Sequence, residues 1–232
     1  MAWTNAASVA VWKTTDFRRF EVTLPLIKGH AGAITDLSFS PFHDHLLASA
    51  SEDGKIKFWM IPKDGLTQHI TKEDMALAGH SKKVMNIKWH NSVEGLLASS
   101  SIDNTVKVWD VNQGKCAYTF NFKSNSTSLQ WNPKGNMLGA MIKGSIFSLF
   151  DPRANEDSLL SQPSHASTKS QKFQWIDDDT IVSCGFNQLN EREWAVWDLR
   201  QQGQGPLASG SLSDGTGIPH IYFDREHKLL YN

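Results

Sequence analysis

The chain contains 232 residues, of which 40% are hydrophobic and 20% are charged, and its formal net charge is −1. A charge this close to zero argues against a generally basic nucleic-acid-binding protein and against a basic membrane-surface protein. Two cysteines cannot make a disulfide framework, and no apolar run reaches the roughly 18–20 residues that span a bilayer. Residues 1–12 also lack the basic start of a signal peptide. We therefore expect a soluble, cytoplasmic protein.

Short strand-like segments recur along the whole chain. The first segment covers residues 3–12, with a strand at Val9–Trp12, and Thr23–Ile27 is its expected outer strand. From residue 34 onward one pattern returns: an apolar or small residue, two spacers, an apolar residue, one spacer and an aromatic residue. Because the pattern recurs at intervals of the size found in propellers and solenoids, it predicts that the chain is built from stacked repeats. Its aromatic positions are Phe39, Trp89, Trp131, Trp175 and Phe223.

A second strand, ending in an aromatic residue, follows each of the first four copies. Aspartate comes directly after three of these strands, which is the Trp-Asp or Phe-Asp ending of a WD repeat. Gly54 and Asn104 precede two of them and suit tight turns. The expected strands are Lys55–Trp59, Thr105–Trp109, Ser145–Phe150 and Trp194–Trp197.

The repeats predict an all-β fold, a WD-repeat β-propeller, because radial repetition of short strands leaves only short edges. The chain begins and ends inside a repeat, since Ile218–Phe223 and Leu229–Tyr231 are the first two strands of a blade. We count half a blade, four whole blades and half a blade, which is an incomplete propeller. The expected blades are 1–28 (the end of the first), 29–78, 79–122, 123–163, 164–211 and 212–232 (the start of the sixth).

Two sets of polar residues recur with identical spacing. Histidine, serine and aspartate resemble a hydrolase triad by residue type, but a catalytic site should occur once. Repetition favours a structural network in which these side chains and a tryptophan form hydrogen bonds across one blade. We therefore expect no enzyme activity. The sets are His30, Ser49, Asp53 and Trp59, and His80, Ser99, Asp103 and Trp109.

Other groups with possible chemistry have simpler interpretations. His43 and His45 fall in one predicted turn and lack a second pair of metal ligands, so a solvated turn is favoured over a metal site. The cluster Asp177–Asp179 lacks the spaced oxygen ligands of a calcium loop. Cys116 and Cys184 lie in strand-like segments and are expected to be buried free thiols. No phosphate-binding or dinucleotide motif is present, and no cofactor is expected.

Basic residues in loops are the candidates for partner binding, because propellers bind partners through loops on a rigid scaffold. An acidic partner would be steered to them by complementary charge. The candidates are Arg18, Arg19, Lys82, Lys83, Arg153 and Arg192.

Several segments together resemble one family of WD-repeat proteins, the coronins. The most specific of them starts at Gly185-Phe186-Asn187, continues through Glu191-Arg192 and ends at Val196-Trp197-Asp198. The others are Gly79–Val84 with Trp89-His90, Asp103–Asp110, Asp151-Pro152-Arg153, and Pro219–Asp224 with Leu230-Tyr231.

This resemblance implies a seven-bladed propeller that binds filamentous actin in the cytoplasmic actin cytoskeleton. It also implies a regulator of actin turnover that acts with the actin-branching complex and cofilin, without enzyme activity or cofactor. The family's basic N-terminal segment, seventh blade and C-terminal coiled coil have no counterpart in this sequence, which indicates a partial chain. A generic WD-repeat scaffold for a multiprotein complex, without actin affinity, is the alternative.

Overall fold

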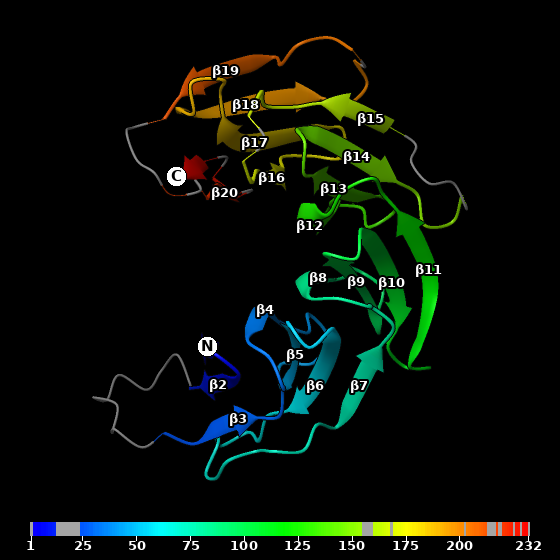
Figure 1. Cartoon of the computed structure of the whole chain (residues 1–232), viewed down its shortest axis with the longest axis vertical. Coiled ribbons are helices and arrows are strands. Elements are labelled where there is room, and N and C mark those ends of the chain that lie inside the picture. Colours follow the sequence, from blue (N-terminus) through cyan, green and yellow to red (C-terminus); the bar gives the residue numbers. More distant parts are fainter. Residues whose placement is uncertain are drawn as a thin grey trace. The chain divides into compact units, whose positions relative to one another are not determined.

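The structure, a computed structural model, describes residues 2–12, 24–154, 160–167, 169–201, 203–212, 217, 220–224, 226–227 and 229–231. Those residues form 21 strands and the turns between them (Figure 1). This confirms the all-β prediction. Among the same residues, no helix is long and apolar enough to cross a membrane. The chain divides into two compact units, Met1–His90 with Glu94–Thr119, and Asn91–Val93 with Phe120–Asn232.

The first unit contains three antiparallel sheets in which consecutive strands are neighbours. The first sheet has three strands, β1 (Ala2–Asn5), β2 (Ser8–Val11) and β3 (Leu26–Lys28). The second has four, β4 (Ile34–Phe39), β5 (Leu46–Ser51), β6 (Lys55–Met60) and β7 (Met75–Ala78). The third consists of β8 (Val84–Trp89), β9 (Leu96–Ser101), β10 (Thr105–Asp110) and β11 (Lys115–Asn121), whose last two residues are assigned to the second unit.

The second unit repeats this arrangement. One sheet consists of β12 (Ser126–Trp131), β13 (Leu138–Ile142), β14 (Ile146–Phe150) and β15 (Leu160–Pro163). The next consists of β16 (Lys172–Trp175), β17 (Thr180–Phe186), β18 (Arg192–Asp198) and β19 (Ala208–Ser211). Two last strands, β20 (Tyr222–Asp224) and β21 (Leu229–Tyr231), form a hairpin.

A β-bulge explains the uneven spacing of the recurring sequence pattern. In a regular strand, side chains alternate between faces, so positions three apart would point to opposite sides. The pairing of β8 with β9 shifts by one residue between Val84 and Asn86, and equivalent shifts occur in β4 and β12. Because the extra residue reverses the alternation, Val84, Ile87 and Trp89 are all buried.

The cores lie between neighbouring sheets. In the first unit Phe58 of β6 packs against Trp89 of β8, with ring centroids 5.7 Å apart and planes at 66°. In the second unit Phe147 of β14 packs edge-to-face on Phe173 of β16, at 5.1 Å. The second strand of each four-stranded sheet is covered on both faces; β5, for example, is buried from Leu47 to Ser51.

Two local predictions have different outcomes. Gly54 and Asn104 occupy equivalent turns with φ of 78° and 66°, which confirms that these positions make tight turns. The expectation of two buried thiols is wrong for one of them, because Cys116 is exposed while Cys184 is buried. Cys116 lies on β11, the edge strand of its sheet, where most side chains face solvent.

Candidate functional site

The first set of polar residues forms a continuous hydrogen-bonded chain in the first unit. His30 lies in the β3–β4 connection, with Nδ1 2.8 Å from Asp53 Oδ2 and Nε2 2.7 Å from Ser49 Oγ. Trp59 donates its indole N–H to the same serine oxygen at 2.8 Å. A neutral imidazole satisfies every group: Nδ1–H donates to the carboxylate, and Nε2 accepts the serine O–H.

The second set repeats this geometry in the next sheet. His80 Nδ1 lies 2.9 Å from Asp103 Oδ2, and its Nε2 lies 2.7 Å from Ser99 Oγ, which accepts from Trp109 Nε1 at 2.8 Å. The same aspartate accepts the backbone N–H of Ser81 at 3.0 Å. The network therefore holds the connection between β7 and β8 against the turn between β9 and β10.

A third network, absent from the sequence predictions, lies in the second unit. His165 Nδ1 is 2.7 Å from Glu193 Oε1, and its Nε2 is 2.8 Å from Ser183 Oγ. Trp197 Nε1 donates to Ser183 Oγ at 2.7 Å. The carboxylate comes from strand β18 rather than from a turn, so the spacing used to find the other two sets does not apply. The remaining signal is a histidine 32 residues before the tryptophan of the Trp-Asp strand, close to the 29 residues that separate these two side chains in the other sets.

The networks are poorly suited to nucleophilic catalysis. Ser49, Ser99 and Ser183 are each 0% exposed, and each hydroxyl oxygen is already occupied by an indole N–H. A substrate carbonyl has no path to these oxygens in this arrangement, although the histidine contacts resemble those of a triad. The geometry supports the structural interpretation, in which loops at the end of each sheet are held in place.

Burial sets the protonation of the networks. It lowers the pKa of His30, His80 and His165 below the usual 6.5, and the carboxylate partners offset this only in part. Burial alone would raise the pKa of Asp103, but hydrogen bonds from Thr105 and His80 outweigh it and lower that pKa to about 2. At pH 7 the three imidazoles are thus neutral, and the carboxylates of Asp53 and Asp103, whose pKa values are lowered, are ionised.

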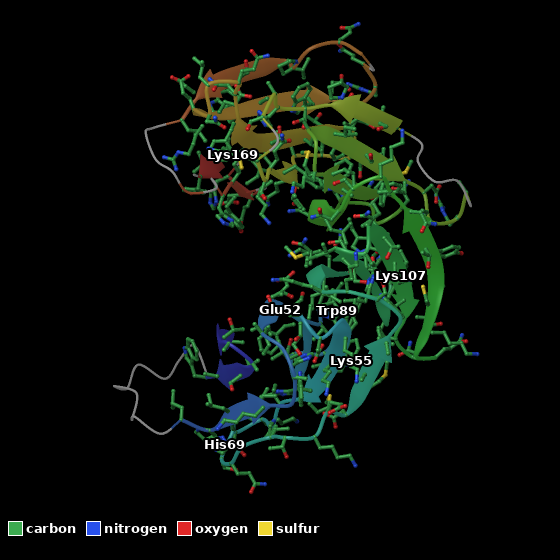
Figure 2. All side chains as sticks on the ribbon, viewed as in Figure 1. Glu52, Lys55, His69, Trp89, Lys107 and Lys169 are labelled. Atoms are coloured by element: carbon green, nitrogen blue, oxygen red, sulfur yellow. The ribbon has the colours of Figure 1, made fainter. Side chains whose placement is uncertain are left out.

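The candidate basic residues fall into different environments. Lys82 is exposed in the β7–β8 connection, and its neighbour Lys83 forms an ion pair with Glu52, which Figure 2 labels. Arg153 pairs with Asp151 through Nη2, at 2.7 Å, while its side chain stays 68% exposed. Arg192 is partly buried at the start of β18. Arg18 and Arg19 lie outside the described residues.

The structure does not bring all these residues together. Lys82 and Lys83 are adjacent in the first unit. In the second unit Arg153 follows the end of β14, whereas Arg192 opens β18, so the two arginines lie at opposite ends of their sheets. The four described candidates therefore do not form one patch.

The other clusters form ordinary surface contacts. His43 Nε2 lies 2.8 Å from Glu94 Oε1, and both side chains are more than half exposed. In the acidic turn, Asp178 pairs with Lys134 Nζ at 3.0 Å. Within the part of the chain that the structure describes, no group of three or more histidine, cysteine or acidic side chains could hold a metal ion.

Comparisons with known proteins agree with this architecture. The family model described as "WD domain, G-beta repeat" matches residues 21–60 and 71–110. The chain is 32% identical over 220 residues to the "Coronin-like protein" of Saccharomyces cerevisiae, covering 90% of this chain and 34% of that protein. It is 34% identical over 211 residues to "Coronin-A" of Dictyostelium discoideum, covering 90% of this chain and 46% of that protein.

A solved structure extends the match to three dimensions. The WD40 domain of Toxoplasma gondii coronin is 30% identical and superposes with a TM-score of 0.92, covering 99% of this chain and 60% of that one. The predicted WD-repeat β-propeller architecture is thereby confirmed. The chain spans between a third and a half of the length of the two curated relatives described above.

Proposed function

The chain belongs to the coronin family of WD-repeat proteins, and from this premise we propose that it binds filamentous actin without catalysing a reaction. The observation that carries the proposal is the similarity to coronins along about nine-tenths of the chain. By the same family resemblance, its setting is the cytoplasmic actin cytoskeleton, and its further partners are the actin-branching complex and cofilin.

Lys82 is the best-placed contact for an acidic filament in the first unit. Its backbone is fixed because the Ser101 hydroxyl donates to the Lys82 carbonyl at 3.2 Å and the Ser81 N–H donates to Asp103. The exposed ammonium group therefore stands on a loop that is already ordered, which reduces the entropy lost on binding. Lys83 contributes less free charge, since it is paired with Glu52.

Cosedimentation of the whole chain with filamentous actin tests the proposal. We expect the wild type to pellet at low salt and to be released as salt rises, because exposed charges are screened. Lys82→Glu should weaken pelleting. Lys63→Glu is the matched control, since Lys63 is also exposed but lies in the β6–β7 connection at the other end of the sheet.

The outcomes separate the possibilities. A wild-type chain that stays in the supernatant at low salt would refute actin binding and favour the generic scaffold, especially if affinity purification recovers other partners and no actin. If the wild type pellets but Lys82→Glu behaves as Lys63→Glu does, Lys82 is not part of the contact.

A further inference from the structure

Three connections of the second unit are tied together by hydrogen bonds. Gln171, only 2% exposed, donates through Nε2 to Ser145 Oγ at 3.2 Å and to the Ser167 carbonyl at 3.1 Å. The Ser145 hydroxyl donates to the same carbonyl at 2.7 Å. Ser167 in turn donates its backbone N–H to the Phe186 carbonyl at 3.0 Å. The β13–β14, β15–β16 and β17–β18 connections therefore form one braced surface.

The β17–β18 connection is also braced internally, by Asn187. Its side-chain oxygen accepts the backbone N–H groups of Leu189 and Glu191, at 2.9 and 3.0 Å. Its side-chain amide donates to Glu191 Oε2 at 2.7 Å, and Asn190 closes the turn with φ of 63°. Ser167 Oγ lies 3.2 Å from Asn190 Oδ1, which joins this turn to its neighbour.

This turn carries an apolar side chain into solvent. Leu189 is 78% exposed, the highest value among the exposed large hydrophobic residues of the described chain. A single exposed leucine is common and by itself indicates nothing. Leu189 differs because its backbone N–H is bonded to Asn187, so the backbone that carries the side chain is ordered before any partner arrives.

Basic groups lie on the same braced surface. Lys169, which Figure 2 labels, is exposed, and its Nζ lies 4.6 Å from the ring centroid of Phe186. Phe186 directly precedes Asn187 in the chain. Lys143 is exposed two residues before Ser145. Two acidic side chains lie there as well: the Glu191 carboxylate is engaged by Asn187, and the Glu193 carboxylate is engaged by His165. An apolar side chain on the same braced surface as two lysines fits a partner with an apolar contact point bordered by carboxylates.

We infer that Leu189 is an anchor that docks on the acidic actin filament, with Lys169 and Lys143 beside it. This inference rests on the proposed function and names a contact in the second unit that the basic-residue prediction does not contain. The preformed turn limits the entropy lost on docking, and Leu189 supplies apolar contact area when the partner covers it.

Cosedimentation with filamentous actin tests the inference, with Leu189→Asp as the main variant. Its matched control is Leu207→Asp, because Leu207 is 56% exposed, belongs to the same sheet region and precedes β19 at the opposite end. Both variants add the same negative charge to the second unit. We expect Leu189→Asp to weaken binding at least about fivefold, the effect of losing one interface anchor, and Leu207→Asp to bind as the wild type does.

A further variant tests the braced turn. Asn187→Ala keeps Leu189 but removes the side chain that orders it, so we expect binding weaker than wild type and stronger than Leu189→Asp. If Leu189→Asp binds within twofold of the wild type while the wild type pellets, the inference is overturned and the proposed function stands. If the wild type does not pellet, both fail. An Asn187→Ala chain that binds as the wild type does would overturn the role of the braced turn.

Discussion

Alanine in place of glycine should affect the first two networks very differently. A Cβ added at Gly29 would lie 2.5 Å from Trp59 Cη2 and 3.2 Å from the Thr71 carbonyl oxygen. At the equivalent Gly79, the nearest atom is Trp109 Cη2 at 3.0 Å, and the next is 3.6 Å away. The first distance requires the indole to move, whereas the second requires a shift of a few tenths of an ångström.

The Trp59 ring has little freedom to move. It is 1% exposed, its N–H is bonded to Ser49, and its edge packs on His30 with centroids 6.3 Å apart. Overpacking a core costs about 1–3 kcal/mol, and straining the indole hydrogen bond adds about 1 kcal/mol. We therefore expect Gly29→Ala to lower the free energy of unfolding by about 2–4 kcal/mol. Gly79→Ala should cost about 1 kcal/mol or less, because the change also reduces the entropy of the unfolded chain.

Urea denaturation followed by tryptophan fluorescence measures both variants under the same conditions. The midpoint of unfolding should fall clearly for Gly29→Ala and little for Gly79→Ala. Since the two positions have the same residue type, the same place in the repeat and the same tryptophan neighbour, each is a control for the other. A loss for Gly79→Ala equal to or greater than that for Gly29→Ala would refute the steric argument.

Two other predictions concern titration and thiol chemistry. Because burial lowers the pKa of His30, His80 and His165, the unfolded chain takes up protons near pH 6.5 that the native chain does not. The free energy of unfolding is therefore highest above that pH and declines below it, by at most about 4 kcal/mol per pH unit for three protons. Urea midpoints that stay constant from pH 7.5 to 5.5 would contradict this. Cys116 is exposed and should react quickly with a thiol reagent at pH 7.5. Burial raises the pKa of Cys184 to about 11 and should keep that thiol inert until the chain unfolds. Labelling of both thiols at the same rate in the native protein would argue against this.

The sequence predicts the strands well because the recurring pattern reflects a local feature. The residues at positions one, four and six of a copy share a face only if a bulge follows the first, and the structure has that bulge in β4, β8 and β12. Both the hydrophobic spacing and the bulge lie within one strand, so no distant partner is needed to recognise them.

The third network illustrates what spacing cannot reveal. In the first two, the carboxylate comes from a tight turn, four residues after the serine, and its position along the chain is fixed. Glu193 lies inside β18 and reaches His165 with a longer side chain. The histidine requires a carboxylate next to its Nδ1, and either a turn or a strand can supply one. For this reason only the folded structure identifies the residue. The exposure of Cys116 depends in the same way on which strand lies at the sheet edge.

The equivalent connections of the first two networks have the same backbone hydrogen bonds but present different side chains to solvent. The carbonyl of Gly32 accepts the Ser51 hydroxyl as the carbonyl of Lys82 accepts the Ser101 hydroxyl, so the two backbones play the same part. At Gly32, however, an added Cβ would lie 2.9 Å from the Asp53 backbone nitrogen, so this connection has no room for a side chain there. The second connection carries an exposed lysine at the matching position. The hydrogen-bonded network can therefore stay the same while the surface it presents changes, which is why partner contacts should be sought at Lys82 and in the braced turn of Leu189 rather than in the buried networks.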